Sequence, residues 1–214
     1  MMVSADNDSR RAGTIWMMNL DESTSVITPL ASAVFCRVES QSASELAEAM
    51  GGNVLTDILN RFETGRRCYA ARIDGRFAAY GWVSFNEEFI GELNLRLKLL
   101  SGEAYIWNCA TLPDFRQNYL YSALSAYIVG ELQKEHLSRA WIGADLDNVP
   151  SQRGIARAGF MYVADLVVVR VLTLRQVWVQ GRPNMPNSLV AEARRAFLND
   201  RDKVWLKASS STST

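Results

Sequence analysis

The chain has 214 residues, of which 48% are hydrophobic, and this is enough for one domain with a sizeable buried core. Lysine plus arginine equals aspartate plus glutamate, at 23 each, so no net charge favours nucleic acid or an anionic membrane as a partner. The three cysteines lie at no metal-binding spacing, and the lone histidine, His136, argues against a histidine-based triad or metal centre. No apolar run reaches membrane-spanning length, and residues 1–13 lack a signal-peptide core. We therefore expect a soluble, cytoplasmic protein with a small-molecule or neutral partner, no metal, no nucleic acid and no membrane.

The two ends of the chain are polar. Residues 4–11 carry charge without an apolar pattern, and residues 209–214 are a Ser/Thr run, which is typical of mobile ends. No repeat or linker-like segment divides the part between them. We therefore expect a flexible segment at 1–25, one domain at 26–175, an extension with one helix at 176–208, and a disordered tail at 209–214.

The first half of the chain predicts a strand, two helices and a series of strands. Gly51 and Gly52 end the first helix, and Gly65 caps the second. Asp74 and Gly75 form a pair that a tight two-residue hairpin turn prefers. The expected elements are a strand at 34–38, helices at 44–50 and 54–62, and four consecutive antiparallel strands at 68–73, 77–85, 90–98 and 104–111.

The second half alternates helices with strands. Apolar residues on one stripe predict an amphipathic helix at 118–134, and a strand follows at 140–146. Asn148 can cap a short helix that has Pro150 in its first turn and Gly159 as its terminator. A long strand at 160–174 and a helix at 187–199 complete the order. This order predicts an α/β fold with a mixed sheet and helices on both faces.

The junction between the strand at 104–111 and the helix at 118–134 points to chemistry. Free backbone amides at a helix start form a site for an anion. Pro113 ends strand pairing where the chain leaves the sheet, so a gap beside that strand can admit a ligand. Arg116 opposes the helix dipole there, which favours an anionic partner.

This part of the chain resembles the GNAT family of acyltransferases. Thr111, Pro113, Phe115 and Arg116 match the V-x-P-x-[YF]-R run that precedes the family's cofactor loop. The family's downstream N-x-x-A…G-F element is matched, at the usual separation, by Asn148, Ser151 at the small-residue position, Gly159 and Phe160. The resemblance spans residues 34–174. It implies the GNAT fold, a mostly antiparallel sheet with helices on both faces in which strands four and five splay apart.

The resemblance also implies an acyl-CoA cofactor, with acetyl-CoA the expected one. Its pantetheine arm would lie between the splayed strands, its pyrophosphate would meet backbone amides, and its acyl group would pass directly to an amine. The cofactor-binding residues implied in this way are Ala110, Thr111, Leu112, Arg116, Gln117, Asn118, Tyr119, Leu120, Tyr121, Ser122, Asn148 and Ser151. The expected acceptor is a small-molecule amine or a peptide amine, and a homodimer is left open.

Two features depart from the family pattern. Tyr119 and Tyr121 stand where the family often has glycine, and a positive φ at Tyr119 would cost about 1 kcal/mol or more. Ile155 stands where many members have a tyrosine that protonates the departing thiolate. These departures leave two alternatives open: a binding or regulatory module without turnover, and a transferase that takes a longer acyl-CoA or an acyl carrier protein.

The sequence names no single catalytic residue. The amine must lose a proton, so a carboxylate or an ordered water is needed as the base. The candidate bases are Glu87, Glu88 and Glu103, although a solvated turn residue is the default for each. The candidate acids are Tyr119, Tyr121, Tyr162 and solvent.

For two further features, a structural role is the preferred interpretation. Cys109 offers a covalent acyl relay, but a buried structural thiol is the preferred interpretation. The strands also carry an aromatic cluster that either packs the core, which is the default, or lines an acceptor or acyl pocket. Its members are Tyr80, Trp82, Phe85, Tyr105 and Trp107.

Overall fold

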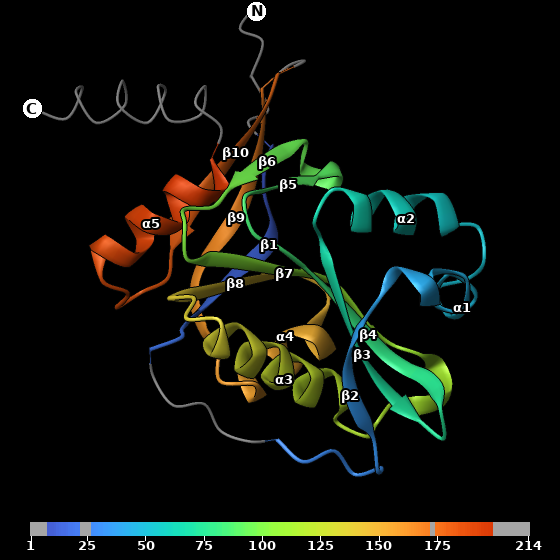
Figure 1. Ribbon diagram of the computed structural model, residues 1–214. Coiled ribbons are helices and arrows are strands. Elements are labelled where there is room, and N and C mark those ends of the chain that lie inside the picture. Colours follow the sequence, from blue (N-terminus) through green and yellow to red (C-terminus); the bar gives the residue numbers. More distant parts are fainter. Residues whose placement is uncertain (1–7, 22–26, 172–173, 199–214) are drawn as a thin grey trace, which may run out of the picture.

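The computed structural model describes residues 8–21, 27–171 and 174–198, and an eight-stranded mixed sheet forms its centre (Figure 1). The strand order is β10-β9-β1-β8-β7-β4-β3-β2, and β7 and β8 form the parallel pair while the other neighbours are antiparallel. The strands are β1 (Asp8–Asn19), β2 (Val34–Val38), β3 (Arg67–Ile73), β4 (Arg76–Ser84), β7 (Glu103–Thr111), β8 (Arg139–Asp145), β9 (Met161–Val171) and β10 (Leu174–Gly181). The expected α/β class with a mostly antiparallel sheet is confirmed.

Helices cover both faces of the sheet (Figure 1). They are α1 (Ala43–Ala49), α2 (Leu55–Glu63), α3 (Leu120–Lys134), α4 (Val149–Arg157) and α5 (Asn187–Phe197). On β1, Trp16 and Met18 pack in the core under α3 and α4, whereas the alternate residues Ile15 and Met17 pack in a second core under α5. A third core lies between β3, β4 and the helices α1 and α2. No helix among the described residues has the length and apolar character needed to cross a membrane.

Local sequence signals account for several element ends. Asp74 and Gly75 both have positive φ, at 50° and 77°, as a tight turn between β3 and β4 requires. Asn148 accepts a hydrogen bond from Ser151 N at 3.1 Å and so caps α4, and Gly159 follows that helix with a φ of 92°. These features were predicted from the sequence and are confirmed.

The expectation of a flexible segment at 1–25 is wrong for residues 8–19. These residues form β1, which lies inside the sheet between β8 and β9. Both faces of this strand are covered, so its residues 13–18 are all buried and show no polar alternation. Residues 1–7, 22–25 and 209–214 lie outside the described residues, and the division into domains stays a prediction.

The structure also differs from the prediction of single strands at 90–98 and 160–174. Residues 87–98 form a separate two-stranded sheet of β5 (Glu87–Ile90) and β6 (Leu95–Lys98), and β7 pairs directly with β4. The break comes from the 3-10 turn η2 (Gly91–Leu93) and from Asn94, whose φ of 48° no strand accommodates. The long last strand is β9, and β10 then pairs antiparallel with it, so the segment after residue 175 adds part of a strand as well as α5.

Candidate active site

The parallel pair β7 and β8 is hydrogen-bonded over its first half. Residues 103–106 pair with residues 139–142, whereas on their other edges β7 pairs with β4 and β8 pairs with β1. In the described part of the chain, the facing edges at residues 107–111 and 143–145 therefore have no strand between them. Unpaired strand edges can hydrogen-bond an extended ligand. This is the opening between two strands that the resemblance implies.

A bulge in β7 shapes this opening. Trp82 of β4 pairs with Trp107, whereas Tyr80 pairs with Ala110, so two residues of β7 face one residue of β4. Asn108, in the bulge, has a φ of 45°. A Cβ on Gly81 of β4 would lie 2.7 Å from Cys109 Sγ, so the glycine makes room for the Cys109 side chain beside the bulge.

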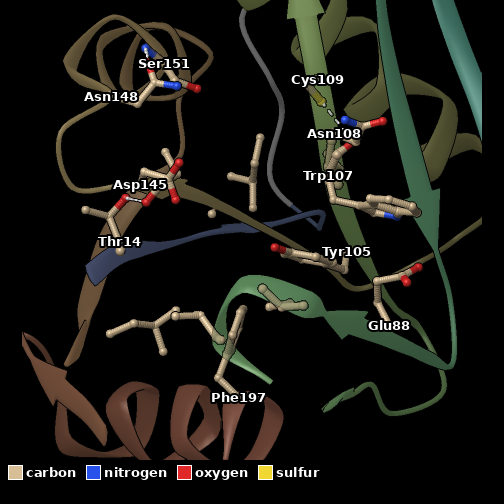
Figure 2. Close-up of a pocket in the computed structure, with 18 of the residues that line it drawn as sticks. Thr14, Glu88, Tyr105, Trp107, Asn108, Cys109, Asp145, Asn148, Ser151 and Phe197 are labelled. Carbon is tan, nitrogen blue, oxygen red and sulfur yellow. Dashed lines mark hydrogen bonds between the residues drawn. The ribbon is translucent and has the colours of Figure 1, made fainter. Parts of the chain in front are cut away.

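A cavity of about 420 Å³ occupies the opening. Figure 2 shows Thr14 and Asp145 on one side of it and Trp107, Asn108 and Cys109 on the other, with Tyr105 between them. Ser151 of α4 and its N-cap Asn148 lie at one end, and Glu88 and Phe197 lie toward the opposite end. The volume falls within the usual range of small-molecule sites, about 300–1,000 Å³.

Three of the residues expected to bind the cofactor line this cavity, namely Tyr121, Asn148 and Ser151. The others do not line it and lie along the continuation from β7 to α3; they are Ala110, Thr111, Leu112, Arg116, Gln117, Asn118, Tyr119, Leu120 and Ser122. Thr111 Oγ1 is buried and has no hydrogen-bond partner among the described residues, whereas Leu112 N donates to Ala78 O at 2.9 Å. An unpaired buried oxygen of this kind can bond a ligand that enters the opening.

The start of α3 presents free amides. The first intrahelical bond runs from Ala123 N to Tyr119 O at 3.0 Å, so the amides of Leu120, Tyr121 and Ser122 have no intrahelical acceptor. No side chain of the described residues caps this helix start. Such amides, together with the helix dipole, favour an anion.

The loop before α3 adopts a left-handed backbone conformation that glycine prefers, although it carries other residues there. Tyr119 has a φ of 57° and Gln117 a φ of 66°, and a non-glycine residue in this region costs about 1 kcal/mol or more. The guanidinium of Arg157 lies 4.3 Å from the centre of the Tyr119 ring and offsets part of this cost. Arg116 is exposed, and its Nε donates to Thr111 O at 3.4 Å.

Tyr121 reaches from α3 to α4. Ser151 Oγ donates to its hydroxyl oxygen at 2.8 Å, which leaves the phenolic hydrogen available for another acceptor. A Cβ on Gly154 would lie 2.6 Å from Tyr121 Cδ1, so the missing side chain of Gly154 makes room for the ring. Burial raises the pKa of Tyr121 above its ordinary value, so the phenol stays protonated at neutral pH. Ile155, by contrast, is fully buried in the core under α3.

The carboxylates proposed as bases lie in different settings. Glu88 lines the cavity, but it accepts from Arg66 Nε at 2.6 Å, from Arg66 Nη2 at 3.1 Å and from Ser84 Oγ. Glu103 does not line it and is buried in an ion pair with Arg195, at 2.6 Å. Glu87 does not line it either and is an exposed residue that pairs with an arginine of β6. The structure therefore favours a structural role for Glu103 and leaves neither Glu87 nor Glu88 as a free carboxylate.

Asp145 is a cavity residue to which the sequence patterns did not point. It ends β8, is exposed, and forms no ion pair with any described residue. Its backbone carbonyl accepts from Asn148 N at 3.1 Å, at the turn that leads into α4. The available signal was a carboxylate that follows an apolar strand and precedes the Asn148 cap.

The proposed acid Tyr162 and the proposed acyl carrier Cys109 both have surroundings that favour a structural role. Tyr162 does not line the cavity; its ring stacks on Trp16 at 4.5 Å, and its hydroxyl donates to Asp165. Cys109 lines the cavity, but burial raises the pKa of its thiol to about 12. A protonated thiol is a poor nucleophile, which agrees with the structural interpretation of Cys109. Among the described residues, no group of three or more His, Cys, Asp and Glu side chains is placed to hold a metal ion.

Comparison with known proteins identifies a family. A family model described as Acetyltransferase (GNAT) family matches residues 36–160, which is more than half of the chain. No curated protein matches the chain by sequence.

Solved structures of this family are similar to the chain in fold. An acetyltransferase of the GNAT family from Colwellia psychrerythraea is 12% identical, with a TM-score of 0.54 over 83% of this chain and 59% of that one. A GCN5-related N-acetyltransferase from Sphaerobacter thermophilus is 12% identical, with a TM-score of 0.58 over 82% of this chain and 54% of that one. A tandem GNAT protein from the clavulanic acid biosynthesis pathway is 19% identical, with a TM-score of 0.50 over 82% and 54%. The chain thus spans little more than half the length of these three proteins.

Proposed function

The chain belongs to the acetyltransferase (GNAT) family, and from this premise we propose that it transfers an acetyl group from acetyl-CoA directly to an amine. Membership of the family implies acyl transfer from acyl-CoA, and the proposal adds the acetyl donor and the amine acceptor. The observation that carries the proposal is the cavity between β7 and β8, where the two strands separate after residues 106 and 142.

The residues present fit acyl-CoA at both ends of the opening. The unpaired edges of β7 and β8 and the unpaired Thr111 Oγ1 suit the amide groups of a pantetheine arm. The amides of residues 120–122 and the exposed Arg116 suit phosphate groups. Acetyl-CoA supplies the thioester: its carbonyl carbon bonds to the amine nitrogen, its C–S bond breaks, and free CoA thiol leaves.

We assign proton transfers to Asp145 and Tyr121. Asp145 is a carboxylate in the cavity wall without an ion-pair partner among the described residues, so it can attract an ammonium group and accept its proton. Tyr121 stays protonated, and its hydrogen is available because its oxygen already accepts from Ser151. It can therefore protonate the departing thiolate in place of the tyrosine that Ile155 replaces. Direct attack by the amine needs no enzyme nucleophile, in agreement with the protonated Cys109.

Titration calorimetry of the purified protein with CoA, acetyl-CoA and pantetheine tests the proposal. We expect CoA and acetyl-CoA to bind, and CoA thiol to be released when an amine panel is added. Arg116→Ala is expected to weaken CoA binding about tenfold, because an exposed phosphate contact is lost, and to leave pantetheine binding unchanged. Absence of binding at millimolar CoA would refute the proposal. Binding of CoA without turnover on any amine would instead support a binding or regulatory module.

A further inference from the structure

Arg61 of α2 lies in the wall of the same cavity. Its guanidinium carbon lies 4.6 Å from the centre of the Trp107 ring and 5.0 Å from that of Trp82. Its Nη1 donates to Asn108 Oδ1 at 2.8 Å, on the side of the cavity where Figure 2 shows Trp107 and Asn108. The indoles and the amide hold this long side chain in one place, which lowers the entropy cost of binding a ligand.

No described carboxylate forms an ion pair with Arg61. Glu88, an acid in the cavity wall, is already bonded to two nitrogens of Arg66, to Ser84 and to the backbone of Phe89. The Arg66 and Glu88 charges therefore largely offset each other. Arg61 forms no ion pair with a described residue, although the negative charges of Asp57 and Glu88 act on it through space. A guanidinium stays charged at neutral pH even where burial lowers its pKa, as it does for Arg61.

The guanidinium also has donors to spare. Asn108 takes a hydrogen bond from one nitrogen, and the rest of the planar fork makes no hydrogen bond with a described residue. Such a fork matches the two oxygens of a carboxylate. A single carboxylate supplies the ion-pair partner that Arg61 lacks among the described residues, whereas a phosphate dianion would place a surplus negative charge near Asp57 and Glu88.

We propose that Arg61 binds a carboxylate of the acceptor, so that the acceptor is a small amine that also carries a carboxylate group. Its amine then faces Asp145, which lies across the cavity from Asn108 and Trp107 (Figure 2). The two opposite charges on opposite walls orient such a molecule in one direction. This inference rests on the proposed function and names the class of acceptor.

The test compares acids with their amides. CoA release from acetyl-CoA is measured with a panel of L-α-amino acids and β-alanine, each beside its primary carboxamide. For the best pair, the wild-type protein is expected to favour the carboxylate in kcat/KM by at least about tenfold. Arg61→Gln is expected to reduce that ratio to near one and to leave the Kd for acetyl-CoA within about twofold. Arg37→Gln, which removes the same charge at an exposed position on β2, is the matched control and should keep the wild-type ratio.

Several results would overturn the inference. If the wild-type protein acts equally fast on acids and amides, the inference is refuted without any variant. It is also refuted if the Arg61→Gln protein keeps the wild-type preference for the carboxylate. If no amine releases CoA, the proposed function fails, and the inference is then decided by calorimetric titration of the same acids and amides. Preferential binding of the acids, lost in Arg61→Gln, supports it, and no preference in binding refutes it.

Discussion

Replacing Tyr121 by phenylalanine tests the proton donor assigned to the site. The change removes one hydroxyl and keeps the ring that fills the space beside Gly154. It also takes away the acceptor of Ser151 Oγ, which bonds the tyrosine oxygen at 2.8 Å. Two effects are therefore expected, one on stability and one on catalysis.

The two effects differ in size. Loss of one partly buried hydrogen bond costs about 0.5–1.5 kcal/mol of unfolding free energy. General acid catalysis contributes about 10²–10⁴ in rate, and a thiolate leaves with little help, so we expect the lower end, about 100-fold in kcat. That is about 2.7 kcal/mol in the activation barrier.

Ser151→Ala separates the two effects. It removes the same hydrogen bond but keeps the phenol, so we expect a similar loss in urea unfolding and a loss of kcat at least about tenfold smaller than for Tyr121→Phe. The assay is steady-state CoA release with a saturating amine between pH 6 and about 10, read against the calorimetric Kd for acetyl-CoA. Because burial raises the pKa of Tyr121 from its ordinary value of 10.0, the wild-type kcat should show no loss of a protonated acid below that pH. Equal losses of kcat in the two variants, or an unchanged kcat in Tyr121→Phe, would refute the assignment.

Two carboxylates are expected to respond in opposite ways. Asp145→Asn should lower kcat/KM for the amine about 100-fold, since it removes the proposed base, while the melting temperature and the Kd for acetyl-CoA change little; a variant of wild-type activity would remove Asp145 from the mechanism. Glu103→Gln should instead leave the pH profile of CoA release as in the wild type and lower the unfolding free energy by about 2 kcal/mol, because Arg195 loses its buried partner. Burial raises the pKa of Glu103, but the Leu100 amide, Arg195 and Arg139 outweigh it, so the folded-state pKa lies below the ordinary 4.5. The stability from this carboxylate is therefore present above pH 4.5 and lost as the pH falls through the folded-state pKa. Urea unfolding from pH 7 to 3 should show this loss in the wild type and not in the variant.

Short-range signals in the sequence predicted much of the fold. The Asp74-Gly75 turn, the Asn148 cap and the Gly159 terminator depend on residues within a few positions of one another, so the local pattern suffices. The same holds for the run from Thr111 to Arg116, where a strand gives way to a helix start. At Tyr119 the sequence raised only the cost that a positive φ would have, and the structure shows that φ to be positive.

The central strand β1 could not be placed in this way. Ile15 pairs with Gly143 on one side and with Ala164 on the other, and both partners are more than a hundred residues away in the sequence. A strand covered on both faces also loses the alternation that identifies a half-buried strand. The sheet position of residues 8–19 is therefore a result of tertiary pairing.

The features of the site also divide into those that the sequence predicted and those that only the tertiary structure decided. By itself the sequence predicted a gap beside the strand that ends at Thr111, a helix start with free amides after it, and the cap at Asn148, because each depends on neighbouring residues. Only the tertiary structure decided that Glu103 is buried with Arg195, that Tyr121 reaches Ser151, and that Arg61 and Asp145 line one cavity. The physical reason is that charge compensation and side-chain direction depend on which elements the sheet brings together, and no periodicity along the chain contains that information.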